Sequence, residues 1–237
     1  MSTIQDEFIA TVSHELRTPL TSIRGFSQTL LASWDKIDDE NKKKFIKIIE
    51  DQSNRLIHLV ENVLSVSKMN ASSEVLKKVD VNEVIKRIIP MFTEQYKTRK
   101  FVQKLNSNLP PARLDEDKFQ QILTNLIDNA AKYSTEGTTV TISTELVENF
   151  VEMKITDEGV GIKKEDFDKV FKKFSRLENH LTSTTQGNGL GLYITKQLVE
   201  NMGGQISFTS EINKGTTFRV LMPVYNQEEV LRCSHKS

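Results

Sequence analysis

His14 lies in the sequence SHELRTPL, residues 13–20, where the neighbouring residue types suit nucleophilic chemistry. Glu15 follows it directly, and Thr18 comes one helical turn later. Pro19 lacks an amide hydrogen and is expected to bend the helix beside them. A carboxylate next to an imidazole holds one ring nitrogen and makes the other a better nucleophile. The pattern therefore favours phosphoryl capture by His14, and the spacing leaves open an ordinary surface or capping histidine.

Two asparagines and a lysine share one edge of another expected helix, in the sequence NLIDNAAKY. Asn125, Asn129 and Lys132 follow one another by steps of four and three residues, which places them on one helix face. An amide oxygen is a hard ligand, and Mg²⁺ takes few protein oxygens when nucleotide phosphates supply the others. A lysine one turn away adds a point charge for those phosphates. A solvent-exposed polar face is the alternative.

The sequence DEGVGI, residues 157–162, directly follows an expected strand. Gly159 and Gly161 would let the backbone approach a flat ligand closely. Asp157 stands at the strand end, where its carboxylate can accept a hydrogen bond from an exocyclic amine such as that of adenine. This pattern indicates an adenine site, and a turn without a ligand is the alternative.

A further glycine cluster, GNGLGL, opens another expected helix and offers backbone amides to an anion. The residues expected at this phosphate site are Gly187, Gly189, Leu190 and Gly191. A Rossmann fingerprint requires a strand directly before the glycines, whereas the polar segment 181–186 precedes them here. That segment, between Arg176 and the glycines, is expected to form a lid over phosphates. The sequence also lacks a P-loop and the HRD and DFG signatures.

The N-terminal part of the chain must position His14, and its apolar residues recur in steps of three and four. They are Val12, Leu16, Leu20, Ile23, Phe26 and Leu30, then Phe45, Ile49, Leu56, Leu59, Val63 and Val66. Residues 33–40 are expected to form the turn, with Asp38 or Asp39 as the N-cap. Two helices cannot cover stripes this wide, so we expect an antiparallel hairpin that dimerises into a four-helix bundle. A hairpin packed on its own chain is the alternative.

The rest of the chain holds nine of the ten glycines and mixes helical with strand patterning. We expect helices at 81–98, 115–132 and 190–202, and strands at 101–105, 139–145, 150–156, 205–210 and 216–222. Gly203 and Gly204 are expected to end the last helix. This order predicts an α/β sandwich, with a mixed sheet covered by helices on one face.

Composition limits the classes of partner. The chain has 237 residues and a formal net charge of zero, which argues against a nucleic-acid partner. Cys233 is the single cysteine and cannot form an intramolecular disulfide, so a reducing compartment fits. No apolar run approaches the roughly 20 residues that span a bilayer. We expect a cytoplasmic chain that makes no membrane contact itself. Whether the full-length protein is a membrane-anchored receptor is left open.

Taken together, these strings resemble the catalytic portion of sensor histidine kinases over about residues 6–224. SHELRTPL is similar to their H box, NLIDNAAKYS to the N box, DEGVGI to the G1 box, FKKF to the F box and GNGLGL to the G2 box. The five boxes occur in the family's order. The implied fold is a dimerisation and phosphotransfer hairpin followed by a Bergerat-type ATP-binding domain.

The resemblance also implies roles for individual residues. His14 matches the phosphorylated histidine, Glu15 the adjacent general base, and Thr18 the residue that positions water during dephosphorylation of the partner. Asn129 matches the Mg²⁺ ligand and Asp157 the adenine-reading carboxylate. The remaining matches to nucleotide-contacting residues are Asn125, Lys132, Tyr133, Gly159, Gly161, Arg176, Gly187, Gly189, Leu190 and Gly191.

The resemblance implies ATP and Mg²⁺ as cofactors, and a homodimer and a response regulator receiver domain as partners. We expect domains at 1–72 and 81–225, joined by a linker at 73–80 and followed by a polar tail at 226–237. Two alternative functions stand beside the kinase. One is an ATPase of the wider Bergerat group that forms no phosphohistidine, and the other is a binding module without catalysis.

Overall fold

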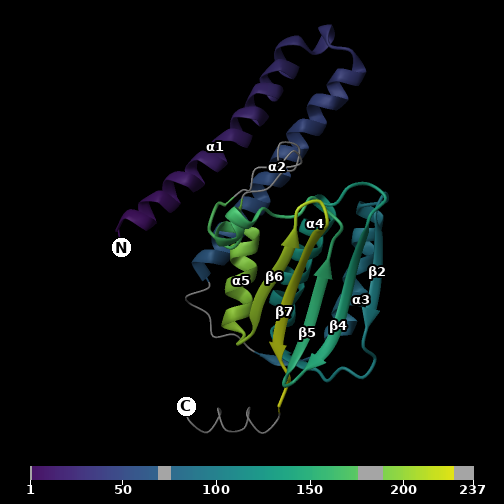
Figure 1. Cartoon of the computed structure of the whole chain (residues 1–237). Coiled ribbons are helices and arrows are strands. Elements are labelled where there is room, and N and C mark those ends of the chain that lie inside the picture. Colours follow the sequence, from purple (N-terminus) through teal and green to yellow (C-terminus); the bar gives the residue numbers. More distant parts are fainter. Residues whose placement is uncertain (1, 69–75, 176–188, 227–237) are drawn as a thin grey trace. The chain divides into compact units, whose positions relative to one another are not determined.

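The computed structural model describes residues 2–68, 76–175 and 189–226 (Figure 1). Within residues 2–9, 58 and 65–68 it describes the backbone only. The chain divides into two compact units, residues 1–71 and 72–237. Each unit is described by itself.

The first unit is the predicted helical hairpin. Helix α1 spans Ser2–Ser33 and helix α2 spans Asp39–Lys68, with a short 3-10 turn, η1, at Trp34–Lys36. Phe26 and Phe45 face each other across the seam with ring centroids 5.1 Å apart. The Asp38 carboxylate accepts a 2.9 Å hydrogen bond from the Asn41 backbone amide, which confirms Asp38 as the cap of α2.

Large apolar side chains remain exposed on this hairpin. They are Leu20, Leu31, Trp34, Ile46, Ile57, Val60 and Leu64. Leu20 and Leu31 are eleven residues apart on α1, as are Ile46 and Ile57 on α2, so each pair lies on one face about three turns apart. The two helices alone therefore leave an apolar surface of the kind that a second copy would bury.

The second unit carries the remaining elements. The helices are α3 at Val81–Gln95, α4 at Glu116–Lys132 and α5 at Gly191–Asn201, with a 3-10 segment, η2, at Lys164–Lys169. The strands are β1 at Lys77–Val79, β2 at Lys100–Leu105, β3 at Ala112–Leu114, β4 at Thr139–Val147, β5 at Phe150–Thr156, β6 at Gln205–Glu211 and β7 at Gly215–Pro223.

Five strands form one mixed sheet in the order β2-β4-β5-β7-β6. Strand β2 runs parallel to β4, and the other neighbouring pairs are antiparallel. Helices α3, α4 and α5 lie on one face of this sheet (Figure 1). Alternate strand residues such as Val140, Ile142 and Val220 are buried, as are Phe119 and Ile127 of α4. The predicted α/β sandwich is therefore confirmed.

Two short strands were not predicted. Strands β1 and β3 pair antiparallel as a separate small sheet. Strand β1 falls inside the segment 73–80 that the sequence suggested as a linker, and Val79 of that strand is buried. Its neighbour Asp80 caps α3 by accepting from the amides of Asn82 and Glu83. Residues 77–80 are thus ordered parts of the second unit.

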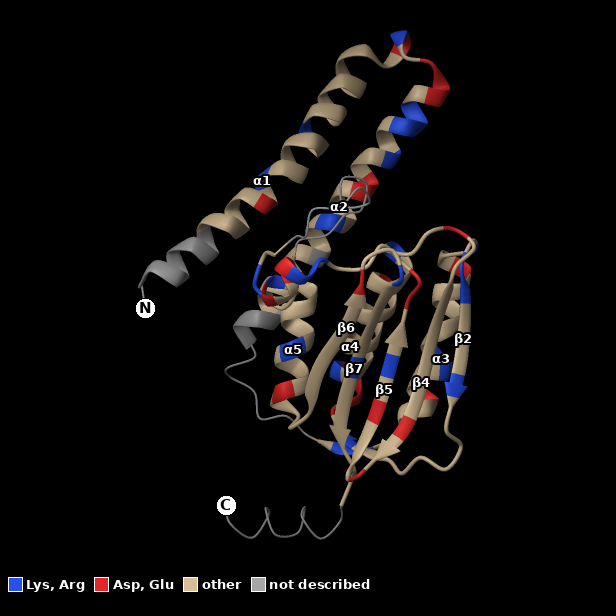
Figure 2. Ribbon diagram, in the orientation of Figure 1, with Lys and Arg blue, Asp and Glu red and all other residues tan. Residues whose placement is uncertain are grey.

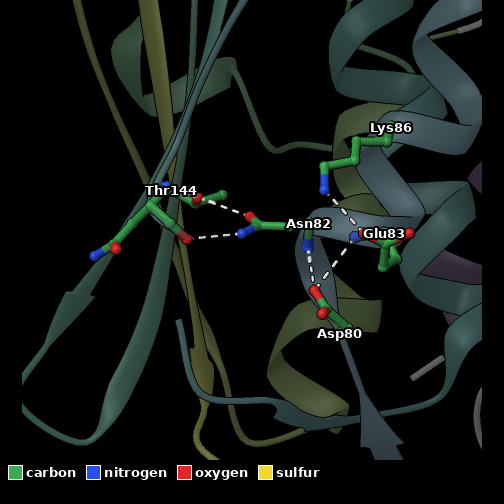
Figure 3. A network of polar contacts seen from close by, with 6 residues as sticks. Asp80, Asn82, Glu83, Lys86 and Thr144 are labelled. Carbon is green, nitrogen blue, oxygen red and sulfur yellow. Dashed lines mark hydrogen bonds and ion pairs between the residues drawn. The ribbon is translucent and has the colours of Figure 1, made fainter. Parts of the chain in front are cut away.

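A buried polar network attaches the start of α3 to the sheet (Figure 3). Asn82 Nδ2 donates to the Asn106 carbonyl at 2.8 Å, and Asn82 Oδ1 accepts from Thr144 Oγ1 at 2.8 Å. Thr144 Oγ1 accepts in turn from the Asn106 amide at 3.1 Å. The two buried side chains, Asn82 and Thr144, thus both have partners, so the helix start is fixed in position on strand β4.

Charges of both signs are interspersed over the described parts of both units (Figure 2). On β5, Lys154 Nζ lies 2.5 Å from the Glu152 carboxylate, and Arg219 of β7 pairs with the same group. This distribution agrees with the formal net charge of zero.

Candidate active site

The C-terminal half of α4 carries the two predicted asparagines and the lysine. Asp115 caps the helix at its start, accepting from the Lys118 amide, and the apolar residues of the other face are buried in the core. This packing leaves Asn125, Asn129 and Lys132 along one partly exposed edge. The predicted helix edge is therefore present.

The two asparagines differ in their contacts. Asn125 Nδ2 donates a 2.6 Å hydrogen bond to Thr195 Oγ1 of α5, so this side chain joins the two helices. The Asn129 side chain is half-buried and makes no hydrogen bond within the described part of the chain. Its amide oxygen is free to bind a cation or a water molecule. Asn125 is thus tied to α5 through its nitrogen, whereas no described residue holds the Asn129 side chain.

Lys132 is held in an ion pair. Its Nζ lies 2.5 Å from Asp128 Oδ2, and the side chains of the pair are 32% and 24% exposed. The next residue, Tyr133, ends the helix, and its carbonyl accepts from the Val160 amide at 3.2 Å. That bond brings the end of α4 against the glycine loop after β5.

Asp157 is the most perturbed acid of this region. It follows β5, is only 5% exposed, and its Oδ1 accepts from the amides of Gly159 at 2.8 Å and Thr216 at 3.1 Å. Burial raises the pKa of this carboxyl to about 6, and the two amide hydrogen bonds act in the opposite direction. No described residue bonds to Oδ2, so one carboxylate oxygen is fixed and the other is available to a ligand.

The glycines of this loop allow close backbone packing. A Cβ on Gly159 would lie 2.2 Å from the Tyr133 carbonyl oxygen, and one on Gly161 would lie 2.1 Å from that of Glu211. Gly161 also has a φ of +68°, which disfavours other residues. The sequence suggested that these glycines make room for a ligand, whereas the contacts show that they make room for neighbouring backbone. Gly159 thus holds the loop after Asp157 against the end of α4, and Gly161 holds it against the end of β6.

The predicted phosphate loop lies partly inside the described residues. Gly189 has a φ of +67° and packs against the backbone of Phe174, and a Cβ on Gly191 would meet the Asn125 amide. The Leu190 side chain is fully buried, so only its backbone can reach a ligand. Arg176, Gly187 and the predicted lid at 181–186 lie outside the described residues.

The predicted acceptor lies in the other unit. His14 is exposed on α1, and the Thr18 hydroxyl donates to its carbonyl at 3.3 Å. The Glu15 carboxylate pairs with Arg55 of α2 at 3.1 Å, and both side chains are less than a quarter exposed. This ion pair holds the carboxylate of the residue next to His14 on the seam of the hairpin.

Sequence reasoning missed several residues that support these groups. Arg55 holds Glu15, Thr195 holds Asn125, and the Thr216 amide holds Asp157. These partners come from distant positions, and no spacing rule connects them. Thr195 alone carries a local signal, because it lies one turn after Gly191 on the helix that the glycine cluster opens.

Two family models match the chain in succession. The His Kinase A (phospho-acceptor) domain matches residues 4–72. The histidine kinase-, DNA gyrase B-, and HSP90-like ATPase matches residues 114–226. The first match covers nearly all of the first unit, and the second covers residues 114–226 of the second unit.

Named proteins show the same relation. The chain is 33% identical over 219 residues to the signal transduction histidine-protein kinase ArlS of Staphylococcus haemolyticus, covering 92% of this chain and 48% of ArlS. It is 34% identical to the sensor histidine kinase WalK of Bacillus subtilis, covering 94% of this chain and 37% of WalK. The chain thus spans about half or less of the length of these relatives.

A solved structure extends the likeness to the fold. The histidine kinase AdeS of Acinetobacter baumannii superposes with a TM-score of 0.73 at 28% identity, over 90% of this chain and 98% of that chain. Among the described residues, none of the helices is long and apolar enough to cross a membrane.

Proposed function

The chain belongs to the sensor histidine kinases, and from that premise we propose that it phosphorylates His14 with ATP and passes the phosphoryl group to a response regulator. An imidazole nitrogen of His14 attacks the γ-phosphorus, the bond to the bridging oxygen breaks, and ADP leaves. An aspartate of the receiver domain then accepts the group from the phosphohistidine.

The state of Asp157 is the single observation that supports nucleotide binding best. A buried carboxylate with one oxygen saturated by two amides presents its other oxygen in a fixed direction. The exocyclic amine of adenine is a donor that suits this acceptor. The neighbouring α4 edge then supplies Lys132 and Tyr133 to the rest of the nucleotide.

Mg²⁺ fits the donor set at this edge. Among the described residues there is no cluster of three histidines, cysteines or carboxylates that could hold a metal alone. One amide oxygen, that of Asn129, suits an ion that takes most of its ligands from phosphates and water. When bound, Mg²⁺ would neutralise charge on the transferring phosphoryl group. We assign Arg176 and the glycines at 187, 189 and 191 to the phosphate side on the family resemblance.

Glu15 is proposed as the group that orients His14. It follows His14 directly, and its carboxylate, which pairs with Arg55 in this structure, is proposed to turn to the imidazole and stabilise the cation formed during attack. Thr18, one turn along the same helix, is proposed to position water when the kinase dephosphorylates its partner.

Two copies of the chain are proposed to associate through the hairpin. The exposed apolar side chains of α1 and α2 support this, because a four-helix bundle would bury them. We propose the cytoplasm as the location, since ATP and a reduced single cysteine suit it.

Incubation with γ-labelled ATP tests the proposal. The wild-type chain should gain an acid-labile, base-stable label that His14→Gln abolishes while nucleotide binding is retained. His58→Gln is the matched control and should keep the label. A label that persists in His14→Gln would refute the acceptor assignment, and release of phosphate without any label would favour an ATPase of the Bergerat group.

A further inference from the structure

Asp128 connects the lysine of the nucleotide edge to a tyrosine on another helix. Asp128 Oδ2 lies 2.5 Å from Lys132 Nζ, and Oδ1 accepts a 2.5 Å hydrogen bond from the Tyr96 hydroxyl. Tyr96 follows directly after the end of α3, 32 residues earlier in the chain. Both oxygens of the carboxylate are therefore occupied, one by each partner.

This arrangement restricts where the lysine can point. A free lysine side chain loses much rotamer entropy when it is fixed on a ligand. Here one of its three N–H groups is used by Asp128, and two remain for a ligand. Because Asp128 lies one turn before Lys132 on the same helix, the pair holds the ammonium along the edge that also carries Asn129.

Tyr96 is itself held in place. The Arg99 guanidinium lies 5.6 Å from the centre of the Tyr96 ring, and Arg99 Nη2 donates to the Ser134 carbonyl at 2.9 Å. Burial and the hydrogen bond to Asp128 raise the pKa of the Tyr96 hydroxyl above its usual range. The hydroxyl is therefore a permanent donor under ordinary conditions, and Asp128 is the acceptor.

We propose that Tyr96 and Asp128 are positioning residues of the nucleotide site, which hold the Lys132 ammonium in place for the phosphates. This inference rests on the proposed function, in which Lys132 binds phosphate. Tyr96 and Asp128 need not contact the nucleotide, since they act through Lys132.

Tyr96→Phe is the sharpest perturbation, because it removes one hydroxyl and leaves every charge in place. Without that donor Asp128 can rotate, and Lys132 is no longer restricted. We expect ATP to bind about 5-fold more weakly, which corresponds to the loss of about one hydrogen bond. Adenosine has no phosphates, so its affinity should not change. Tyr225→Phe is the matched control, because it removes the same hydroxyl from a tyrosine that lies just after the end of β7.

A double substitution separates positioning from general damage. In a Lys132→Met background, Tyr96→Phe should cause no further loss of ATP affinity, because the group through which it acts is gone. Equilibrium titration of the full chain with ATP and with adenosine gives both affinities, and urea unfolding of the same samples reports their stability.

Each outcome of these titrations either supports or overturns the positioning role of Tyr96 and Asp128. Selective loss of ATP affinity that disappears in the Lys132→Met background supports the proposal. Equal weakening of ATP and adenosine by Tyr96→Phe, or additive losses in the double variant, would overturn it. A wild-type chain that binds adenosine and ATP equally would remove the phosphate role of Lys132, whereas one that binds neither would refute the proposed function itself.

Discussion

The buried Asp157 carboxyl should make stability, and the proposed nucleotide recognition, depend on pH. Burial raises its pKa from 3.8 to about 6 in the folded chain. A difference of about 2 pKa units corresponds to about 3 kcal/mol. The folded state binds the proton more tightly than the unfolded state, so this contribution to stability is fully present below pH 3.8 and is lost as the pH rises through about 6. The fold therefore keeps an unfavourable buried carboxylate at neutral pH.

The proposed adenine recognition uses the ionised form of Asp157. Oδ1 already accepts from two amides, so a proton on the carboxyl lies on Oδ2 and competes with the adenine amine for that oxygen. One pH unit below the folded pKa about a tenth of the carboxylates are ionised, and adenosine should bind about 10-fold more weakly than at about pH 8. At about pH 6, binding should release about half a proton.

Calorimetric titration with adenosine across this pH range measures both quantities, since buffers of different ionisation enthalpy report the released proton. Adenosine carries no group that titrates between these conditions. Asp157→Asn is the control: it cannot ionise, and its adenosine affinity should be lower and flat with pH. An affinity of the wild-type chain that does not vary with pH, or a variant that keeps the same dependence, would refute the reasoning.

Two substitutions test other parts of the second unit. Asn129→Asp should weaken ATP binding when Mg²⁺ is present, because it adds a charge beside the phosphates; unchanged affinity in the titration would remove the ligand role of this residue. Asn82→Ala removes the acceptor of the buried Thr144 hydroxyl and the side-chain donor to the Asn106 carbonyl, and should lower the free energy of unfolding by about 2 kcal/mol in urea. Glu83 is the control, because its side chain forms an exposed ion pair with Lys86, and Glu83→Ala should change that free energy by less than about 1 kcal/mol. An equal effect of the two substitutions would contradict the role of the network.

The helices were predictable because their signals are local. The apolar steps of three and four on α1 and α2 and the Asp38 cap are all read within a few residues. The α4 edge followed from the same periodicity, since the spacing of Asn125, Asn129 and Lys132 alone sets their common face.

The small β1–β3 sheet was not predictable in the same way. A strand of three residues is too short to show alternation, and its pairing joins Val79 to Ala112 across a long stretch of chain. Asp80, beside this strand, was predicted to lie in the linker, whereas its hydrogen bonds show that it caps α3. A short strand is defined by the strand with which it pairs, and its own residues do not indicate which segment that is.

In the candidate site, too, the residue types were predictable from local sequence and their surroundings were not. Short sequence motifs predicted His14, Asn129 and Asp157 as functional residues, but the groups that hold residues of this kind come from distant positions in the chain. The Thr216 amide lies 59 residues from Asp157, and Arg55 lies 40 residues from Glu15.

These distant partners decide how strongly each chemical group acts. The Asp157 carboxyl has its raised pKa because the fold buries it, and one of its oxygens points outward because two amides hold the other. A substitution at Asp157 therefore tests which chemistry is present, whereas one at Tyr96 tests how precisely Lys132 is placed. If placement matters as proposed, variants of the supporting residues should alter ligand selectivity, whereas variants of the chemical groups should weaken binding of every ligand that uses the removed group, because the first change geometry and the second remove the interaction.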